Sequence, residues 1–139
     1  MQVRKLDHVN VHTANLASLV EWYGRVLGTR SGERPPFPFP GAWLYCGGEP
    51  TVHLVGVDKL AKTEGLLQLE HFAFSATGLK EFVGSLERDK VRYEARKVPR
   101  SGAVQVNVWD PDGNHIHVDF APEESAGIEL QEVTTGGMR

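Results

Sequence analysis

The chain is poor in cysteine, in clustered basic residues and in long apolar runs, and each shortage excludes a class of protein. Cys46 is the single cysteine among 139 residues, so no intrachain disulfide can form, and we expect a small buried thiol in a cytoplasmic protein. No apolar run approaches the roughly 20 residues that span a bilayer, and no apolar signal core follows Met1, so neither membrane insertion nor secretion is predicted. The formal charge is -3 and the sequence contains no stripe of basic residues, so nucleic acid is not an expected partner.

What the chain does contain is an internal repeat in which each copy carries two histidines. Residues 6–11 (LDHVNV) return as residues 69–74 (LEHFAF), and residues 52–54 (VHL) return as residues 116–118 (IHV). The two spacings differ by one inserted residue. Two similar units that pack about a pseudo-twofold axis could bring one early and one late histidine from each copy to a single point, where they would bind a metal. The four histidines are His8, His53, His71 and His117.

Both copies predict the same order of secondary structure, namely a strand, a helix and three strands. In the first copy, alternation and helical spacing predict a strand over 3–12, a helix over 16–27, and strands over 30–33, 42–46 and 51–57. We expect Asn15 to cap this helix, Gly28 to end it, and residues 47–50 to form a tight turn. In the second copy the same patterns predict a strand over 68–75, a helix over 78–90, and strands over 92–98, 103–109 and 114–120.

These elements predict an α+β fold in which two βαβββ modules form a curved mixed sheet. With 40% hydrophobic residues, the chain is large enough to bury a core without disulfides. We expect residues 1–120 to form a single domain, with module one over 1–62 and module two over 66–120. Periodicity is lost from Ala121 onward, so residues 121–139 are predicted to be a flexible tail or an arm that lies on a partner subunit.

The repeated histidines share one predicted face of the sheet. If each strand buries its branched and aromatic residues under a helix, the four imidazoles project to the opposite, concave face, where neutral imidazoles could hold a divalent ion. The alternative is a polar cavity in which they form hydrogen bonds without a metal. His12 and His115 have no histidine counterpart in the other copy, so we assign them to the rim or to ordinary hydrogen bonds. Asp119 shares the face, although we expect its carboxylate to be solvated or salt-bridged.

Three sequence features resemble the vicinal oxygen chelate superfamily: the Leu-Asp-His opening, residues 22–28 (WYGRVLG) at the helix end, and residues 110–114 (DPDGN) before the last strand. This superfamily includes glyoxalases, fosfomycin resistance enzymes, extradiol dioxygenases and bleomycin-binding proteins. The resemblance implies that His8 and His71 are metal ligands, and that His53 stands where some members have a further ligand. It also implies a homodimer. His117 departs from the pattern, because metal-binding relatives usually carry a glutamate there, both as a ligand and for proton transfer.

The resemblance implies a metal-dependent, glyoxalase-like lyase or isomerase that acts on a small substrate with vicinal oxygens. His8, His53, His71 and His117 would hold a divalent ion, which could be zinc, nickel, iron or manganese, and His117 would be the catalytic residue that moves a proton. One alternative is a protein that sequesters a ligand without chemistry, as the bleomycin binders do. Another is a ring-cleaving dioxygenase, which usually needs two histidines and one carboxylate.

One connection could contribute to substrate binding. Residues 34–41 (RPPFPFPG) are stiffened by their prolines, so Phe37, Phe39 and the nearby Trp43 form either an apolar wall at the mouth of the site or a packed linker. Three arginines could meet a carboxylate or phosphate of the substrate, namely Arg30, Arg34 and Arg100.

Overall fold

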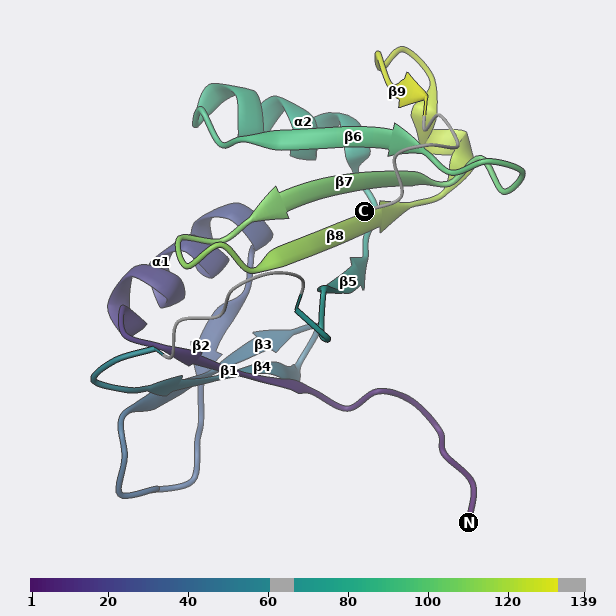
Figure 1. Ribbon diagram of the computed structural model, residues 1–139. Helices are drawn as coiled ribbons and strands as arrows, with labels where there is room; N and C mark the ends of the chain where they lie inside the picture. The colour runs from purple at the N-terminus through teal and green to yellow at the C-terminus, as the bar shows by residue number, and fades with distance from the viewer. Residues whose placement is uncertain (61–66, 133–139) are drawn as a thin grey trace. The chain divides into compact units, whose positions relative to one another are not determined.

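The computed structural model describes residues 1–60 and 67–132. The chain divides into two compact units, Met1–Gly65 and Leu66–Arg139. Each unit contains one α-helix and one mixed sheet (Figure 1). Among the described residues, no helix is long and apolar enough to cross a membrane.

The first unit has the predicted order of elements. These are β1 (Val9–Thr13), α1 (Leu16–Leu27), β2 (Arg30–Gly32), β3 (Gly41–Cys46) and β4 (Glu49–Gly56). The strands lie in the order β1-β4-β3-β2, with β1 parallel to β4 and the other pairs antiparallel.

The second unit repeats this arrangement and extends it. Its elements are β5 (His71–Ser75), α2 (Leu79–Arg88), β6 (Tyr93–Lys97), β7 (Val104–Trp109), β8 (His115–Phe120), the 3-10 helix η1 (Pro122–Ser125) and β9 (Gln131–Glu132). The strand order is β5-β8-β7-β6-β9, with β5 parallel to β8 and β9 parallel to β6. The predicted α+β class with two βαβββ modules is therefore confirmed.

The strand register repeats as well. Asn10 of β1 lies opposite His53 of β4, and Ala73 of β5 lies opposite His117 of β8. Asn10 lies two residues after His8, and Ala73 lies two residues after His71. The early and late histidines of each copy therefore occupy equivalent places on neighbouring parallel strands. The internal repeat seen in the sequence is thus a repeat of structure.

Each sheet buries one face under its helix. Helix α1 packs against β2, β3 and β4, and its residues Leu19 and Tyr23 have no exposed surface. In β4 the two residues that flank His53 are also fully buried, namely Val52 and Leu54. In the second unit the ring of Phe82 in α2 contacts that of Phe120 in β8, with 5.8 Å between centroids. In both sheets the late histidine therefore alternates with apolar residues that belong to the core.

The turn between β3 and β4 is shorter than predicted. Gly47 and Gly48 both have positive φ angles, 55° and 87°, as a two-residue hairpin turn requires, so β4 begins at Glu49 rather than at Thr51. As predicted, α1 ends at Gly28, which takes the left-handed conformation. The N–H of Gly28 donates to the carbonyl of Gly24. Asn15 precedes α1, but its side chain makes no capping hydrogen bond.

The prediction of a strand from residue 3 was wrong, because β1 begins at Val9 and residues 1–8 have no regular structure. The first residue pair of the parallel ladder joins Val9 to Val52. Further back along β4 lies Pro50, which has no amide hydrogen to donate to a neighbouring strand. The pairing of β1 with β4 therefore begins at Val9, and His8 lies immediately before the strand.

Part of the segment predicted as a tail carries secondary structure. Glu124 of η1 accepts hydrogen bonds from the backbone N–H groups of Gly78 and Leu79, at 2.7 and 2.9 Å. Its carboxylate thereby caps the N-terminus of α2, where an acidic group is favoured. Residues 131–132 pair with β6, and residues 133–139 lie outside the described residues. A flexible tail or dimer arm over residues 121–139 stays a prediction.

We expect Glu124→Ala to lower the free energy of unfolding by about 1 kcal/mol, the usual effect of losing a helix cap. Urea denaturation monitored by circular dichroism measures this loss. Glu123→Ala is the matched control, since Glu123 lies in the same 3-10 helix but is exposed. Equal loss in both variants would show that the contact with α2 has no stabilising role.

Candidate metal centre

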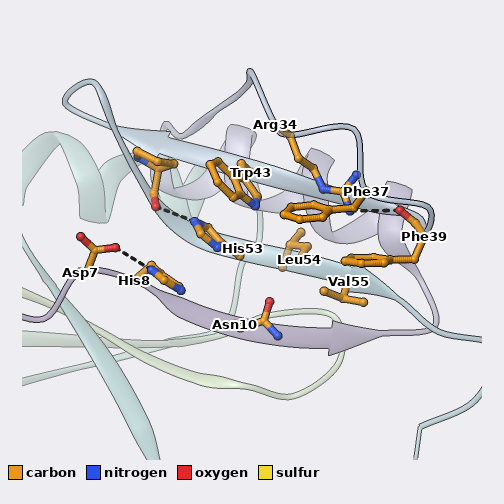
Figure 2. Close-up of a pocket in the computed structure, with 11 residues that line it drawn as sticks. Asp7, His8, Asn10, Arg34, Phe37, Phe39, Trp43, His53, Leu54 and Val55 are labelled. Atoms are coloured by element: carbon orange, nitrogen blue, oxygen red, sulfur yellow. Dashed lines mark hydrogen bonds and ion pairs between the residues drawn. The ribbon is translucent and has the colours of Figure 1, made fainter.

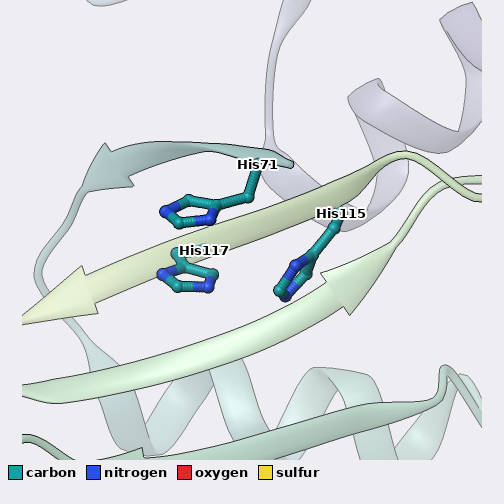
Figure 3. A group of neighbouring side chains, drawn as sticks. All are labelled: His71, His115 and His117. Carbon is teal, nitrogen blue, oxygen red and sulfur yellow. The ribbon is translucent and has the colours of Figure 1, made fainter. Parts of the chain in front are cut away.

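Each unit holds a stacked pair of imidazoles made from its early and its late histidine. In the first unit the rings of His8 and His53 lie 3.9 Å apart between centroids, with 14° between their planes (Figure 2). In the second unit the rings of His71 and His117 lie 4.0 Å apart, with 10° between their planes (Figure 3). Each repeat thus brings its two predicted histidines together, and the binding of one ion by all four stays a prediction.

The early histidine of each pair is held by the acidic residue that precedes it. His8 donates from Nδ1 to the carboxylate of Asp7 at 2.7 Å, and His71 donates from Nδ1 to the carboxylate of Glu70. The hydrogen bond to histidine lowers the pKa of each carboxyl group. An imidazole that donates from Nδ1 presents the lone pair of Nε2, the arrangement in which carboxylates commonly fix metal-binding histidines.

Both late histidines have a pKa below the ordinary value for histidine. His53 donates from Nε2 to the carbonyl oxygen of Pro50 at 3.0 Å, so its Nδ1 carries the lone pair, and burial together with the charge of His8 lowers its pKa. His117 is only 6% exposed, and burial, then the charges of His71 and His115, lower its pKa to about 4. Both rings are therefore suited to bind a metal at neutral pH.

The Nε2 atom of His117 is the most informative atom in this unit. It is buried and has no hydrogen-bond partner among the described residues. A buried polar atom without a partner is costly. A divalent ion bound to Nε2 would satisfy it, so the residues present fit the metal that the resemblance implies.

His115 joins this group, although its place in the sequence predicts a position at the rim or ordinary hydrogen bonds. The potential ligand atoms of His71, His115 and His117 all lie within 4.8 Å of one another, and Figure 3 shows the ring of His115 set across the other two. Its Nδ1 bonds the carboxylate of Glu70 at 2.7 Å and its Nε2 bonds Oδ1 of Asn107 at 2.9 Å. His115 could therefore ligate only after one of these bonds breaks.

The spacing of ligand atoms is close to what one ion needs. Metal–nitrogen bonds of about 2.0–2.1 Å place two ligands at most roughly 4.2 Å apart, so small side-chain shifts would bring the three rings together. The signal for His115 was present in the sequence, because histidines two positions apart on a strand share a face. The hydrogen bonds that hold it come from β7 and from Glu70, which no local pattern indicates.

Asp119 differs from its expectation. We expected a solvated or salt-bridged carboxylate, but its Oδ1 is buried without a hydrogen-bond partner in the described part of the chain. Burial raises the pKa of this carboxyl group. Asp119 lies two residues after His117 on β8, opposite Ser75, and so places a carboxyl group on the histidine-bearing face.

The first unit adds an open cavity of about 490 Å³ beside its histidine pair (Figure 2). Trp43 stacks on His53, with 4.1 Å between centroids and 10° between the planes. Phe37 and Phe39 are 43% and 42% exposed and line the cavity, which favours the apolar wall over the packed linker. The cavity is lined by Asp7, His8, Asn10, Arg34, Phe37, Phe39, Trp43, Pro50, His53, Leu54 and Val55.

Comparisons with known proteins agree with this fold. No family model matches the chain, and no curated protein matches it, but many solved structures do. A protein described as a glyoxalase family member from Bacillus anthracis superposes with a TM-score of 0.72 and 20% identity, over 87% of this chain and 98% of its own. Lactoylglutathione lyase from Agrobacterium tumefaciens gives a TM-score of 0.63 and 20% identity, over 87% and 95%. The fosfomycin resistance protein FosX from Listeria monocytogenes gives 0.66 and 12%, over 88% and 98%.

The chain therefore has the fold of the vicinal oxygen chelate superfamily, as the sequence resemblance implied. At these identities the likeness defines the fold and leaves the reaction to be argued from the residues. The binding of one ion by both histidine pairs and the catalytic role of His117 stay predictions.

Proposed function

We propose that this protein is a metal-dependent lyase or isomerase whose small substrate binds the metal through vicinal oxygens. The observation that carries the proposal is the buried, unpartnered Nε2 of His117, stacked beside His71. The histidine group and the fold of the structural neighbours support a metal-binding protein of glyoxalase-like fold.

His71 and His117 would hold the ion, and the pair His8 and His53 would complete its ligands. Imidazole ligands suit zinc, nickel and iron, and manganese remains a further candidate. When bound, such an ion supplies a Lewis acid that polarises a substrate oxygen and stabilises negative charge next to it. Glu70 and Asp7 orient the early histidines by accepting their Nδ1 protons.

Proton transfer needs a group other than the ligands. With its pKa near 4, His117 holds no proton at neutral pH and is a weak base, which favours its role as a ligand over its predicted catalytic role. Asp119 offers a carboxyl group two residues away whose Oδ1 has no hydrogen-bond partner in the described residues. We propose that Asp119 takes up the proton that leaves the substrate carbon.

The experiment combines metal analysis with hydrogen exchange at carbon. Tag-free protein loaded with zinc, nickel, iron or manganese would be mixed in D₂O with α-hydroxy ketones, α-keto acids and lactoylglutathione, and followed by NMR. We expect exchange of the C–H next to the carbonyl that requires the metal and is lost in Asp119→Asn, which should still retain metal. Metal-independent exchange, or none with any compound, would contradict a lyase or isomerase.

A second function is favoured by a separate observation. The aromatic cavity of the first unit would suit a protein that sequesters a ligand without chemistry, and it involves Phe37, Phe39 and Trp43. Tight binding of a ligand without exchange in the same experiment would support this alternative.

We also propose a homodimer, for which light scattering should give about twice the mass of one chain.

Glu70→Gln is expected to weaken metal affinity about 10–100-fold, the usual effect of removing an outer partner of a ligand histidine. The carboxylate bonds both His71 and His115, and the neutral amide would orient them less firmly. Competition with a fluorescent chelator measures the affinity. Glu49→Gln is the control, since Glu49 pairs with Lys5 on the surface, and an equal loss there would refute a specific role for Glu70.

A further inference from the structure

The cavity of the first unit has a cation at its aromatic end. The guanidinium carbon of Arg34 lies 5.0 Å from the ring centroids of both Phe37 and Phe39. These two rings are nearly parallel, with 11° between their planes and 5.2 Å between centroids. Figure 2 shows Arg34 beside the two rings and the imidazoles of His8 and His53 toward the other end of the cavity.

Local structure fixes the position of this guanidinium. Its Nη2 donates to the carbonyl oxygen of Phe39 at 3.0 Å. A side chain at Gly41 would come within 2.8 Å of Nη2, so the group packs closely against the backbone where the stiff connection enters β3. The cation is therefore preorganised on aromatic surface, and binding costs little of its side-chain entropy.

The charge of Arg34 is not neutralised within the described residues. No ion pair to an acidic side chain involves it there, and a guanidinium has five N–H donors, of which the Phe39 carbonyl takes one. The acidic residue that lines the cavity is Asp7, and it is bonded to His8 at the other end. The aromatic end is thus positive, and it is arranged for planar, charge-assisted hydrogen bonds to an anion.

We propose that this cavity binds an aromatic carboxylate, with its ring against Phe37, Phe39 and Trp43 and its carboxylate on Arg34. About 490 Å³ falls within the usual range of small-molecule sites and accommodates a one- or two-ring acid. The step from a bound aromatic carboxylate to the substrate class of the enzyme rests on the proposed function. Binding itself requires no metal, so it can be tested separately.

The probes are 1-naphthoate and its neutral isostere 1-naphthamide, titrated calorimetrically into EDTA-treated protein. We expect naphthoate to bind at least about tenfold more tightly than naphthamide, since a charge-assisted bond contributes that much. Arg34→Gln should weaken naphthoate binding at least about tenfold and leave naphthamide unchanged, whereas Phe39→Leu should weaken both. Arg30→Gln is the matched control, because Arg30 lies on β2 in the same unit and does not line the cavity.

Several outcomes would overturn the inference. Equal affinity for the two probes would show an apolar pocket without anion recognition, and wild-type affinity in Arg34→Gln would place the anion elsewhere. Absence of naphthoate binding by the wild-type protein would also contradict it. Circular dichroism melting confirms that each variant is folded, and Arg34→Lys, which keeps the charge but loses the planar group, should bind with intermediate affinity.

Metal content measured on the same proteins before EDTA treatment separates this inference from the proposed function. If the protein retains metal but does not bind naphthoate, the aromatic carboxylate inference alone is contradicted. If it binds naphthoate but is purified without metal, the metalloenzyme proposal alone is contradicted.

Discussion

Replacing His117 with alanine is expected to weaken metal binding by more than about 100-fold, so that the purified variant retains no stoichiometric metal. Loss of an outer partner alone costs about 10–100-fold, and here a ligand itself is removed. His71→Ala should have the same effect, because its ring is stacked on that of His117. Elemental analysis after gel filtration, followed by zinc titration against a chelator, measures both changes.

The alanine variants need a control for general effects on the fold. His12 is suitable because it is exposed on β1 and belongs to neither stacked pair, so His12→Ala should retain the metal content of the wild type. His117→Ala removes a buried nitrogen without a partner, so the metal-free variant should remain folded in circular dichroism. Full metal content in both His71→Ala and His117→Ala would show that the proposed site is misplaced.

Acidification of the metal-free protein is expected to cost about 3 kcal/mol of stability through His117 alone. Burial lowers the pKa of this imidazole from 6.5 to about 4 in the folded state. Between these pH values the unfolded chain binds a proton that the folded chain does not, so the free energy of unfolding falls as pH decreases. The stabilisation is complete above pH 6.5 and is lost by about pH 4, at about 1.4 kcal/mol for each pKa unit.

Urea unfolding at a series of pH values between 7.5 and 4, with EDTA present, measures this dependence. His117→Asn should flatten the curve by the full amount, and His12→Asn should leave it unchanged. His53 adds a smaller slope of the same sign, since its pKa is also lowered. The pKa of Asp119 is raised in the folded state. This carboxyl group therefore destabilises the fold as pH rises above the ordinary pKa of an aspartate. A His117→Asn curve parallel to that of the wild type would refute the buried neutral imidazole.

Periodic and repeated features of this fold were predictable from the sequence. Alternation and helical spacing predicted both helices and the core strands to within a few residues, except for the start of β1, because burial of one face imposes that pattern on any amphipathic element. The repeat gave more, since equivalent positions in two copies take equivalent places in their sheets. For this reason the sequence predicted the four histidines as one group, and the structure stacks His8 on His53 and His71 on His117. The binding of one ion by all four stays a prediction.

Features that depend on distant partners were not predictable. Glu124 caps a helix that begins 45 residues earlier, and no local pattern indicates such a contact. The hydrogen bonds of His115 to Glu70 and Asn107 likewise join separate strands. The start of β1 depends on Pro50 of another strand, and the burial of Asp119 depends on the packing around β8. In each case the deciding atom belongs to another element.

X-ray absorption spectroscopy of the zinc-loaded protein shows whether the histidines hold the ion, because it reports the ligands around the metal. We expect one zinc per chain, imidazole nitrogens at about 2.0–2.1 Å, and a loss of imidazole scattering in variants of either stacked pair. Zinc surrounded by oxygen alone, or an imidazole signal unchanged in His71→Ala and His117→Ala, would contradict this expectation.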